Sequence, residues 1–226
     1  ARAITPYTAD DGWEMSSPRW LPDASGVTFV RGSGRNDRGE YPNPALDAKG
    51  RSQLVMLARP DGGAPRTLAE GSSPEPSPDG KIVAFMRGGA IYTIALDSGA
   101  RERRLFIGRG RDGGVRWSPD GSRIAFSSNR RDHSFIGVFD LRESTLRYMA
   151  PSVDDDGNPV WSPDGRSVAF IRQPTLTRQA RHAPRRAGRP WSILVADPAT
   201  GAAHEQWRAK PGAGSMFRRT DSRDQL

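Results

Sequence analysis

The sequence predicts an all-β protein of the β-propeller class, with about four four-stranded blades visible. The pentapeptide Trp-Ser-Pro-Asp-Gly stands at 117–121 and again at 161–165, and Pro-Ser-Pro-Asp-Gly stands at 76–80. A stretched copy begins at Trp20, so that successive Pro-Asp steps are 56, 41 and 44 residues apart. A period near 40 residues, with several short β-rich segments in each repeat, is typical of propeller blades.

The repeated pentapeptide has the residue preferences of a type I turn that ends in glycine. Proline presets φ, the Ser and Asp side chains bond the nearby backbone, and glycine accepts a positive φ. A type I turn followed by a left-handed glycine commonly closes a short β-hairpin. We therefore expect each copy to join two antiparallel strands. The turn residues are Pro78, Asp79, Gly80, Pro119, Asp120, Gly121, Pro163, Asp164 and Gly165.

Three apolar segments follow each turn in order. In the third repeat, Ile124-Ala125-Phe126 comes directly after the turn, Phe135–Phe139 forms a second strand, and Leu146–Met149 forms a last one. With the strand before the turn, each repeat has four strands, the number in a propeller blade. We expect the end of a preceding blade and a linker at 1–16, blades at 17–70, 71–110, 111–152 and 153–210, and the start of a following segment at 211–226.

Two insertions and several charged segments fall on one predicted face of the blades. If the strands run A to D from the axis outward, the Pro-Asp-Gly turns join A to B, and the B–C loops and D–A crossovers lie at the other end. The insertion 32–51 and the Arg-rich insertion 173–190 are then both B–C loops. Loops on a rigid scaffold often carry function. The candidate substrate- or domain-facing residues are Arg130, Asp132, His133, Arg172 and Trp191.

The amino-acid composition excludes some classes of function and makes others unexpected. The chain has no cysteine, which excludes thiol catalysis and disulfides. No apolar run approaches the roughly 18 residues of a membrane span, so none is expected. Much of the net charge of +8 lies in the Arg-rich insertion. Aromatic residues do not interleave with these arginines as a stacking platform requires, so nucleic-acid binding is not expected. Binding through 173–190 stays open as a hypothesis, and would depend steeply on salt.

Other polar and aromatic residues have structural interpretations. The turn already explains the turn aspartates, so we expect no metal and no cofactor. The acidic crossover Asp154–Asp156 lacks the spacing of a calcium loop and is interpreted as solvated. For Asp132 and His133 the alternative is a linker held by local hydrogen bonds. Trp20, Trp117 and Trp161 share one repeat position, which predicts packing between blades.

Several segments resemble known families. The turn repeats are similar to those of TolB-like propellers, whose WD40-like repeats are called PD40. Longer segments resemble the propeller of bacterial S9 serine peptidases, the prolyl oligopeptidase family; they are 129–138, 151–154, 159–165 and 190–197, with shorter matches at 10–12 and 41–44. This resemblance implies that the blades belong to a seven- or eight-bladed ring that precedes an α/β-hydrolase domain with a Ser-Asp-His site.

The resemblance implies a function for the chain. It would be the non-catalytic propeller region of a secreted or periplasmic S9 serine peptidase of the dipeptidyl or oligopeptidase type, gating peptide access and docking the hydrolase domain. Its partners would be that domain of the same protein, peptide substrates and other copies of the chain. No Gly-x-Ser-x-Gly elbow occurs in the sequence, so the catalytic serine is not expected here. The alternative is a TolB-like propeller that acts as a protein–protein interaction module through its B–C loop face.

Overall fold

A computed structural model describes residues 4–7, 13–32, 52–97, 99–175 and 190–210 of the chain. These residues fall into two compact units that meet in sequence at Phe106 and Ile107, and each unit is described by itself. The described residues form strands, turns and irregular segments without a helix. Accordingly, no helix among them is long and apolar enough to cross a membrane. The prediction of an all-β protein is confirmed.

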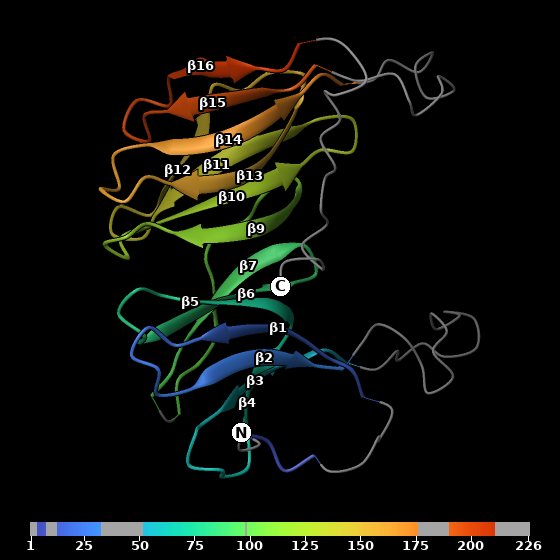
Figure 1. Cartoon of the computed structure of the whole chain (residues 1–226), viewed down its shortest axis with the longest axis vertical. Coiled ribbons are helices and arrows are strands. Elements are labelled where there is room, and N and C mark those ends of the chain that lie inside the picture. Colours follow the sequence, from blue (N-terminus) through green and yellow to red (C-terminus); the bar gives the residue numbers. More distant parts are fainter. Residues whose placement is uncertain (1–3, 8–12, 33–51, 98, 176–189, 211–226) are drawn as a thin grey trace, which may run out of the picture. The chain divides into compact units, whose positions relative to one another are not determined.

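The first unit contains two four-stranded antiparallel sheets, shown in blue to green in Figure 1. Blade 1 consists of β1 (Met15–Trp20), β2 (Val27–Arg31), β3 (Leu54–Ala58) and β4 (Arg66–Glu70). Blade 2 consists of β5 (Ser72–Pro76), β6 (Ile82–Arg87), β7 (Ala90–Ala95) and β8 (Arg103–Arg104). In both sheets the strands are hydrogen-bonded in sequence order, as in a propeller blade.

The second unit repeats the pattern twice. Blade 3 consists of β9 (Arg111–Trp117), β10 (Arg123–Asn129), β11 (Ser134–Asp140) and β12 (Thr145–Met149). Blade 4 consists of β13 (Asp155–Trp161), β14 (Val168–Gln173), β15 (Ser192–Ala196) and β16 (Ala203–Arg208). A single parallel bridge between Ser134 and Asp155 connects the two blades. The four-stranded repeat predicted from the sequence is therefore present four times, and β1 begins two residues before the expected start of the first blade at residue 17.

Apolar side chains pack successive blades together inside each unit. In the first unit, Val55 and Ala69 of blade 1 pack against Val83, Phe85 and Ile94 of blade 2. The second unit has the equivalent cluster between blades 3 and 4; its members are Ala125, Ile136, Val138, Met149, Val168, Phe170, Leu194 and Ala196. Central strands such as Ile82–Arg87 are apolar almost throughout because both of their faces are buried.

The three Ser-Pro-Asp-Gly turns have the same geometry. In each, the serine hydroxyl donates to the aspartate Oδ1 at 2.6 Å. The same oxygen accepts the backbone N–H two residues further on, at 3.0–3.1 Å. The glycines have φ of +67°, +70° and +69°, a region that favours glycine. The turns therefore satisfy their own polar groups and fix the register of the A–B hairpin.

A second repeated feature, a β-bulge in strand A, was not predicted. Three residues before the end of each A strand the backbone has a positive φ, and the pairing with strand B shifts register there. Such a bulge bends the strand and increases its twist. The four residues are Ser17, Ser73, Gly114 and Asn158. Glycine and asparagine adopt a positive φ readily, but serine does not, so no single residue type marks this position in all four blades.

The predicted packing of the three tryptophans between blades agrees with the structure for Trp117 and Trp161 but not for Trp20. Trp117 is buried, and Trp161 donates its indole N–H to the Arg116 carbonyl at 3.0 Å. Arg123 also lies over the Trp161 ring, at 5.0 Å. Trp20, however, is 62% exposed, so the prediction is wrong for that residue. The reason is that Trp161 packs against the blade before its own, and none precedes Trp20 among the described residues.

The turn aspartates predict a specific acid sensitivity. The hydroxyls of Ser118 and Ser122, with the Ser122 N–H, lower the pKa of Asp120 from 3.8 to about 2. A depressed folded-state pKa gives stability that is present above the unfolded pKa and lost as pH falls toward about 2. Asp120→Asn should therefore destabilise the protein at neutral pH, by roughly 1 kcal/mol or less because the carboxylate is exposed. Urea unfolding should show this difference shrinking below about pH 3. A difference that stays constant with pH would contradict this account.

Candidate functional site

The loop between β10 and β11 holds three of the predicted site residues, and short hydrogen bonds fix its shape. The Arg130 N–H donates to the His133 carbonyl, and the Arg131 N–H donates to Asn129 Oδ1, both at 2.8 Å. His133 Nδ1 lies 2.8 Å from Asp132 Oδ1. The loop therefore has the local hydrogen bonds that a structural linker requires, while the Asp132 side chain remains largely exposed to solvent.

The Arg130 side chain is held against blade 3 by a hydrogen bond and by contacts with two aromatic rings. Its Nη2 donates to the Tyr148 hydroxyl at 2.6 Å, and its guanidinium lies 5.8 Å from the Phe135 ring centre and 5.6 Å from that of Tyr148. Its Nε is buried and has no hydrogen-bond partner within the described part of the chain. The His133 ring packs edge-on against Phe135 at 4.7 Å. These side chains form one aromatic and cationic cluster on the side of the blade.

Arg172, at the end of β14, forms a buried ion pair with Asp156. Arg172 Nε lies 2.7 Å from Asp156 Oδ1, and Nη2 lies 2.8 Å from Oδ2. Nη2 also donates to the Ala150 carbonyl at 2.6 Å. The Asp156 side chain is fully buried, which raises the pKa of its carboxyl, while the bonds from Arg172 oppose that rise. The interpretation of Asp154–Asp156 as a solvated crossover is therefore wrong for Asp156, which lies inside β13 and neutralises the arginine.

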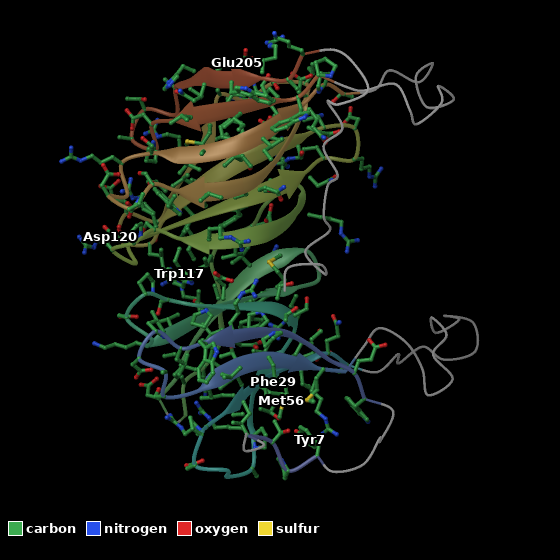
Figure 2. All side chains as sticks on the ribbon, viewed as in Figure 1. Tyr7, Phe29, Met56, Trp117, Asp120 and Glu205 are labelled. Atoms are coloured by element: carbon green, nitrogen blue, oxygen red, sulfur yellow. The ribbon has the colours of Figure 1, made fainter. Side chains whose placement is uncertain are left out.

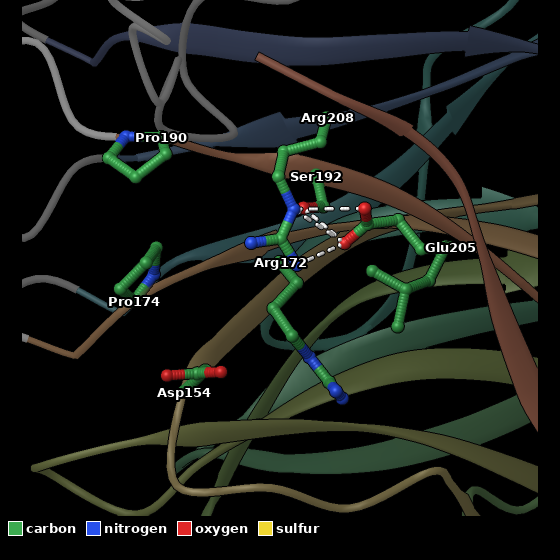
Figure 3. A pocket seen from close by; sticks show the side chains of 8 residues that line it. Asp154, Arg172, Pro174, Pro190, Ser192, Glu205 and Arg208 are labelled. Carbon is green, nitrogen blue, oxygen red and sulfur yellow. Dashed lines mark hydrogen bonds and ion pairs between the residues drawn. The ribbon is translucent and has the colours of Figure 1, made fainter. Parts of the chain in front are cut away.

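Beside this pair lies a hollow of about 340 Å³ in the second unit (Figure 3). Glu205 is held in it by Ser192, whose hydroxyl donates at 2.9 Å, and by Arg208, whose Nη2 lies 2.6 Å away. Hydrogen bonds from these two side chains lower the pKa of Glu205, with Arg208 the larger cause. The hollow thus contains fixed charges of both signs. Its lining is Asp154, Arg172, Pro174, Pro190, Ser192, Leu194, Glu205 and Arg208.

Thr175 connects the hollow to the β10–β11 loop. Its N–H donates to Asp154 Oδ1 at 3.3 Å, and its hydroxyl bonds the carbonyls of Asp132, at 3.3 Å, and of Val153. The structure thus brings the backbone of Asp132 and the rim of the hollow to the same end of blades 3 and 4. This is the end opposite the Pro-Asp-Gly turns, where the sequence placed the B–C loops.

Trp191 does not join this group. Its ring packs against Trp207 at 4.7 Å, and Trp207 lies on the face of blade 4 that points away from the hollow. Conversely, Ser192, Glu205 and Arg208 line the hollow and were not predicted. The only signal for them was the spacing of Glu205 and Arg208 in the last strand, which an ordinary exposed strand also shows.

Several predicted features lie outside the described residues. They are the arginines of the insertion at 176–189, the first insertion at 33–51, the acidic segment 8–12 and the segment 211–226. Among the residues that are described, no group of three or more His, Asp or Glu side chains is arranged to hold a metal ion.

Comparison with known proteins identifies the family. The family model described as the TolB β-propeller domain, PD40, matches residues 45–180. An uncharacterised protein of Agrobacterium fabrum is 34% identical over 150 residues, which are 60% of this chain and 50% of that protein. The chain therefore spans about half the length of this curated relative.

Solved structures share the fold at low identity. TolB from Acinetobacter baumannii matches with a TM-score of 0.56 and 21% identity, over 85% of this chain and 43% of that one. The acylaminoacyl peptidase of Pyrococcus horikoshii matches with a TM-score of 0.62 and 16% identity, over 91% of this chain and 34% of that one. The β-propeller domain of the Pyrococcus furiosus trilobed protease has a TM-score of 0.61 and 15% identity, over 87% of this chain and 58% of that one. Because the PD40 model covers more than half of the sequence and the blades show its turns, the chain belongs to the TolB β-propeller family.

Proposed function

We propose that the chain is a non-catalytic interaction module that binds a polypeptide partner at the B–C loop end of blades 3 and 4. The observation that supports this most directly is the hollow between Asp154, Arg172 and Glu205. Binding sites are typically concave, with an apolar lining and a few fixed polar groups. Here Leu194 and two prolines supply the apolar lining, and the charged groups surround it.

The charges of the hollow suit a peptide better than a small anion or cation. Asp156 fixes the Arg172 guanidinium, and Ser192 and Arg208 fix the Glu205 carboxylate, so both signs are presented in set positions. A polypeptide offers N–H and C=O groups as well as charged side chains, and can satisfy both signs at once. Groups that are already ordered lose little entropy on binding, which favours affinity.

This proposal predicts that substitutions in the hollow lower the affinity of the chain for its polypeptide partner. Arg208→Gln should weaken capture of the partner by about 10-fold, since a rim charge with one binding contact is worth about 1–2 kcal/mol. Arg208 is 66% exposed, so its replacement should leave the fold intact. Arg142→Gln, in the exposed β11–β12 turn at the other end of blade 3, is the matched control and should capture as the wild type does. Immobilised variants, with mass spectrometry of bound proteins, provide the measurement. Equal losses for both variants would argue for general charge effects.

A second candidate function is the propeller of an S9 serine peptidase, which would gate peptide access and dock an α/β-hydrolase domain. The support is the likeness of the fold to the two Pyrococcus peptidases and the resemblance of residues 129–138 and 190–197 to that family. In this case the partner at the loop end is the hydrolase domain or a peptide substrate. Under either candidate we propose a periplasmic or secreted location, by family resemblance.

A serine-reactive fluorophosphonate probe separates the two candidates. Applied to the native protein, it should label a species far heavier than 24.7 kDa if the chain is the propeller of a serine peptidase. If the chain acts as an interaction module, the species that contains it should remain unlabelled. Intact mass and peptide mapping of the labelled band identify whether this sequence is part of it.

A further inference from the structure

The hollow in the second unit carries one carboxylate more than its guanidiniums neutralise. Arg172 bonds both carboxylate oxygens of Asp156. Arg208 does the same for Glu205, which stands on β16, the last strand of blade 4 (Figure 2). Asp154 also lines the hollow, and no arginine or lysine among the described residues forms an ion pair with it. One negative charge is therefore left without a cation.

The Asp154 carboxylate is positioned with one oxygen available. Its Oδ1 accepts the Thr175 N–H at 3.3 Å, and the Thr175 hydroxyl is itself bonded to two backbone carbonyls. No hydrogen bond from the described part of the chain reaches Oδ2. In Figure 3 no dashed line meets Asp154, whereas Glu205 and Arg208 are joined. A ligand can therefore donate to Oδ2 without breaking a contact inside the protein.

The rest of the hollow offers an apolar surface next to this charge. Pro174, Pro190 and Leu194 supply it. Leu194 also belongs to the cluster between blades 3 and 4, so the hollow lies on the face of blade 4 that packs against blade 3. Its volume of about 340 Å³ is near the lower end of the range of ligand sites. This size suits one long side chain with its flanking backbone.

The lining favours a ligand group with an apolar stem and a compact positive charge at its end. A lysine side chain has this form, since its ammonium group is a point charge on a flexible hydrocarbon stem. Arginine fits less well, because its planar fork is matched best by two free carboxylate oxygens, and Thr175 already bonds one oxygen of Asp154. A metal ion has too few ligands, since no group of three or more acidic or histidine side chains is arranged for one among the described residues.

We propose that the hollow selects a lysine side chain of the polypeptide partner, an inference that rests on the proposed function and names the group that the same site recognises. The lysine ammonium donates to Asp154 Oδ2, and its stem packs on the two prolines and Leu194. Asp154 is only partly exposed, which makes the ion pair stronger than one in open water. Nη1 of Arg208 bonds no described residue, so it can donate to a backbone carbonyl of the same peptide.

A set of capped peptides tests this selectivity on the purified chain. Each pool holds labelled pentapeptides, acetylated and amidated at their ends, with random flanks and a fixed central lysine, norleucine, arginine or glutamate. Fluorescence anisotropy at low ionic strength gives the affinities. The lysine pool should bind at least about 10-fold more tightly than the norleucine pool, because norleucine keeps the stem but lacks the charged donor. A lysine-free pool with a free N-terminus separates a terminal amine from a lysine as the source of the ammonium group.

Substitutions of Asp154 connect the preference to this carboxylate. Asp154→Asn retains an oxygen for the Thr175 N–H, so it should fold and should reduce the preference for lysine to about twofold or less. Asp154→Lys should reverse the preference in favour of the glutamate pool. The matched control is Asp140→Asn in the β11–β12 turn, at the other end of blade 3, where an asparagine oxygen can accept the same two backbone N–H groups. This variant should prefer lysine as the wild type does.

The possible results separate the lysine assignment from the interaction function itself. If no pool binds at about 1 mM, the proposed interaction function fails and the lysine assignment fails with it. If the pools bind equally well, or if the preference for lysine survives Asp154→Asn, the chain still binds peptides but the lysine assignment is overturned. Tighter binding of the lysine-free pool with a free N-terminus would also overturn it, and would identify a terminal amine as the ligand.

Discussion

Arg172→Met should lower the free energy of unfolding by about 3–5 kcal/mol, because it leaves the carboxylate of Asp156 buried without its counter-ion. The Asp156 side chain is fully buried, and both of its oxygens accept from Arg172. Methionine retains most of the apolar stem, so the loss reports the charge more than the packing. The Ala150 carbonyl, which Arg172 also bonds, loses its donor in the same variant.

The pH dependence distinguishes this mechanism from a packing defect. Burial raises the pKa of Asp156, and removing Arg172 takes away the interaction that opposes the rise. A carboxyl with a raised folded-state pKa loses stability as pH rises from its unfolded pKa to its folded pKa. The deficit of Arg172→Met should therefore be small near pH 4 and grow toward pH 7. The double variant Asp156→Leu with Arg172→Met should recover much of the stability. A deficit that is equal at both pH values would contradict the buried-charge account.

Phe170→Ala should cost a comparable 3–5 kcal/mol through a cavity between blades 3 and 4. Phe170 is 1% exposed and lies in the cluster with Ile136, Val138 and Met149. Arg172 also lies 5.7 Å from its ring centre, so the ring supports the ion pair as well as the core. Urea unfolding followed by intrinsic tryptophan fluorescence, to which Trp117 and Trp161 contribute, provides the measurement.

The control for this prediction is Phe170→Leu, which retains most of the buried volume. It should cost about 1–2 kcal/mol, since shape changes without a large cavity are better tolerated. A loss below about 1 kcal/mol for the alanine variant would show that the two sheets close over the gap. In that case the blades of the second unit would be less rigidly packed than their burial indicates.

Much of the fold could be predicted because its signals are local. A turn such as Ser118–Gly121 closes through its own side chains, and the strands that follow it are read from a short apolar run. The bulges at Ser17 and Ser73 could not be predicted, because serine does not favour a positive φ and strand pairing imposes that conformation there. The exposure of Trp20 was missed for a related reason, since its burial depends on a neighbouring sheet.

The candidate site was harder to predict than the fold. Arg172 was predicted as a substrate- or domain-facing residue, but its partner Asp156 was interpreted as one of three solvated aspartates. Alternation along β13 turns Asp156 inward and Asp155 to the other face, and Asp154 precedes the strand and stays partly exposed. A run of identical residues hides these differences. Ser192, Glu205 and Arg208 are adjacent only through the β15–β16 ladder, a long-range pairing that no short motif encodes.

The B–C connections differ greatly in length although the strands they join do not change register. Two residues connect β6 to β7, and 22 connect β2 to β3, yet both pairs run without a register shift. The free-energy cost of closing the 22-residue loop, which is entropic, exceeds that of the two-residue loop by only about 2 kcal/mol. Insertions in the B–C connections therefore leave the pairing of strands B and C unchanged, and they cost little folding free energy. Relatives with the same blades can acquire new loops here, so specificity can diverge among them faster than the scaffold does.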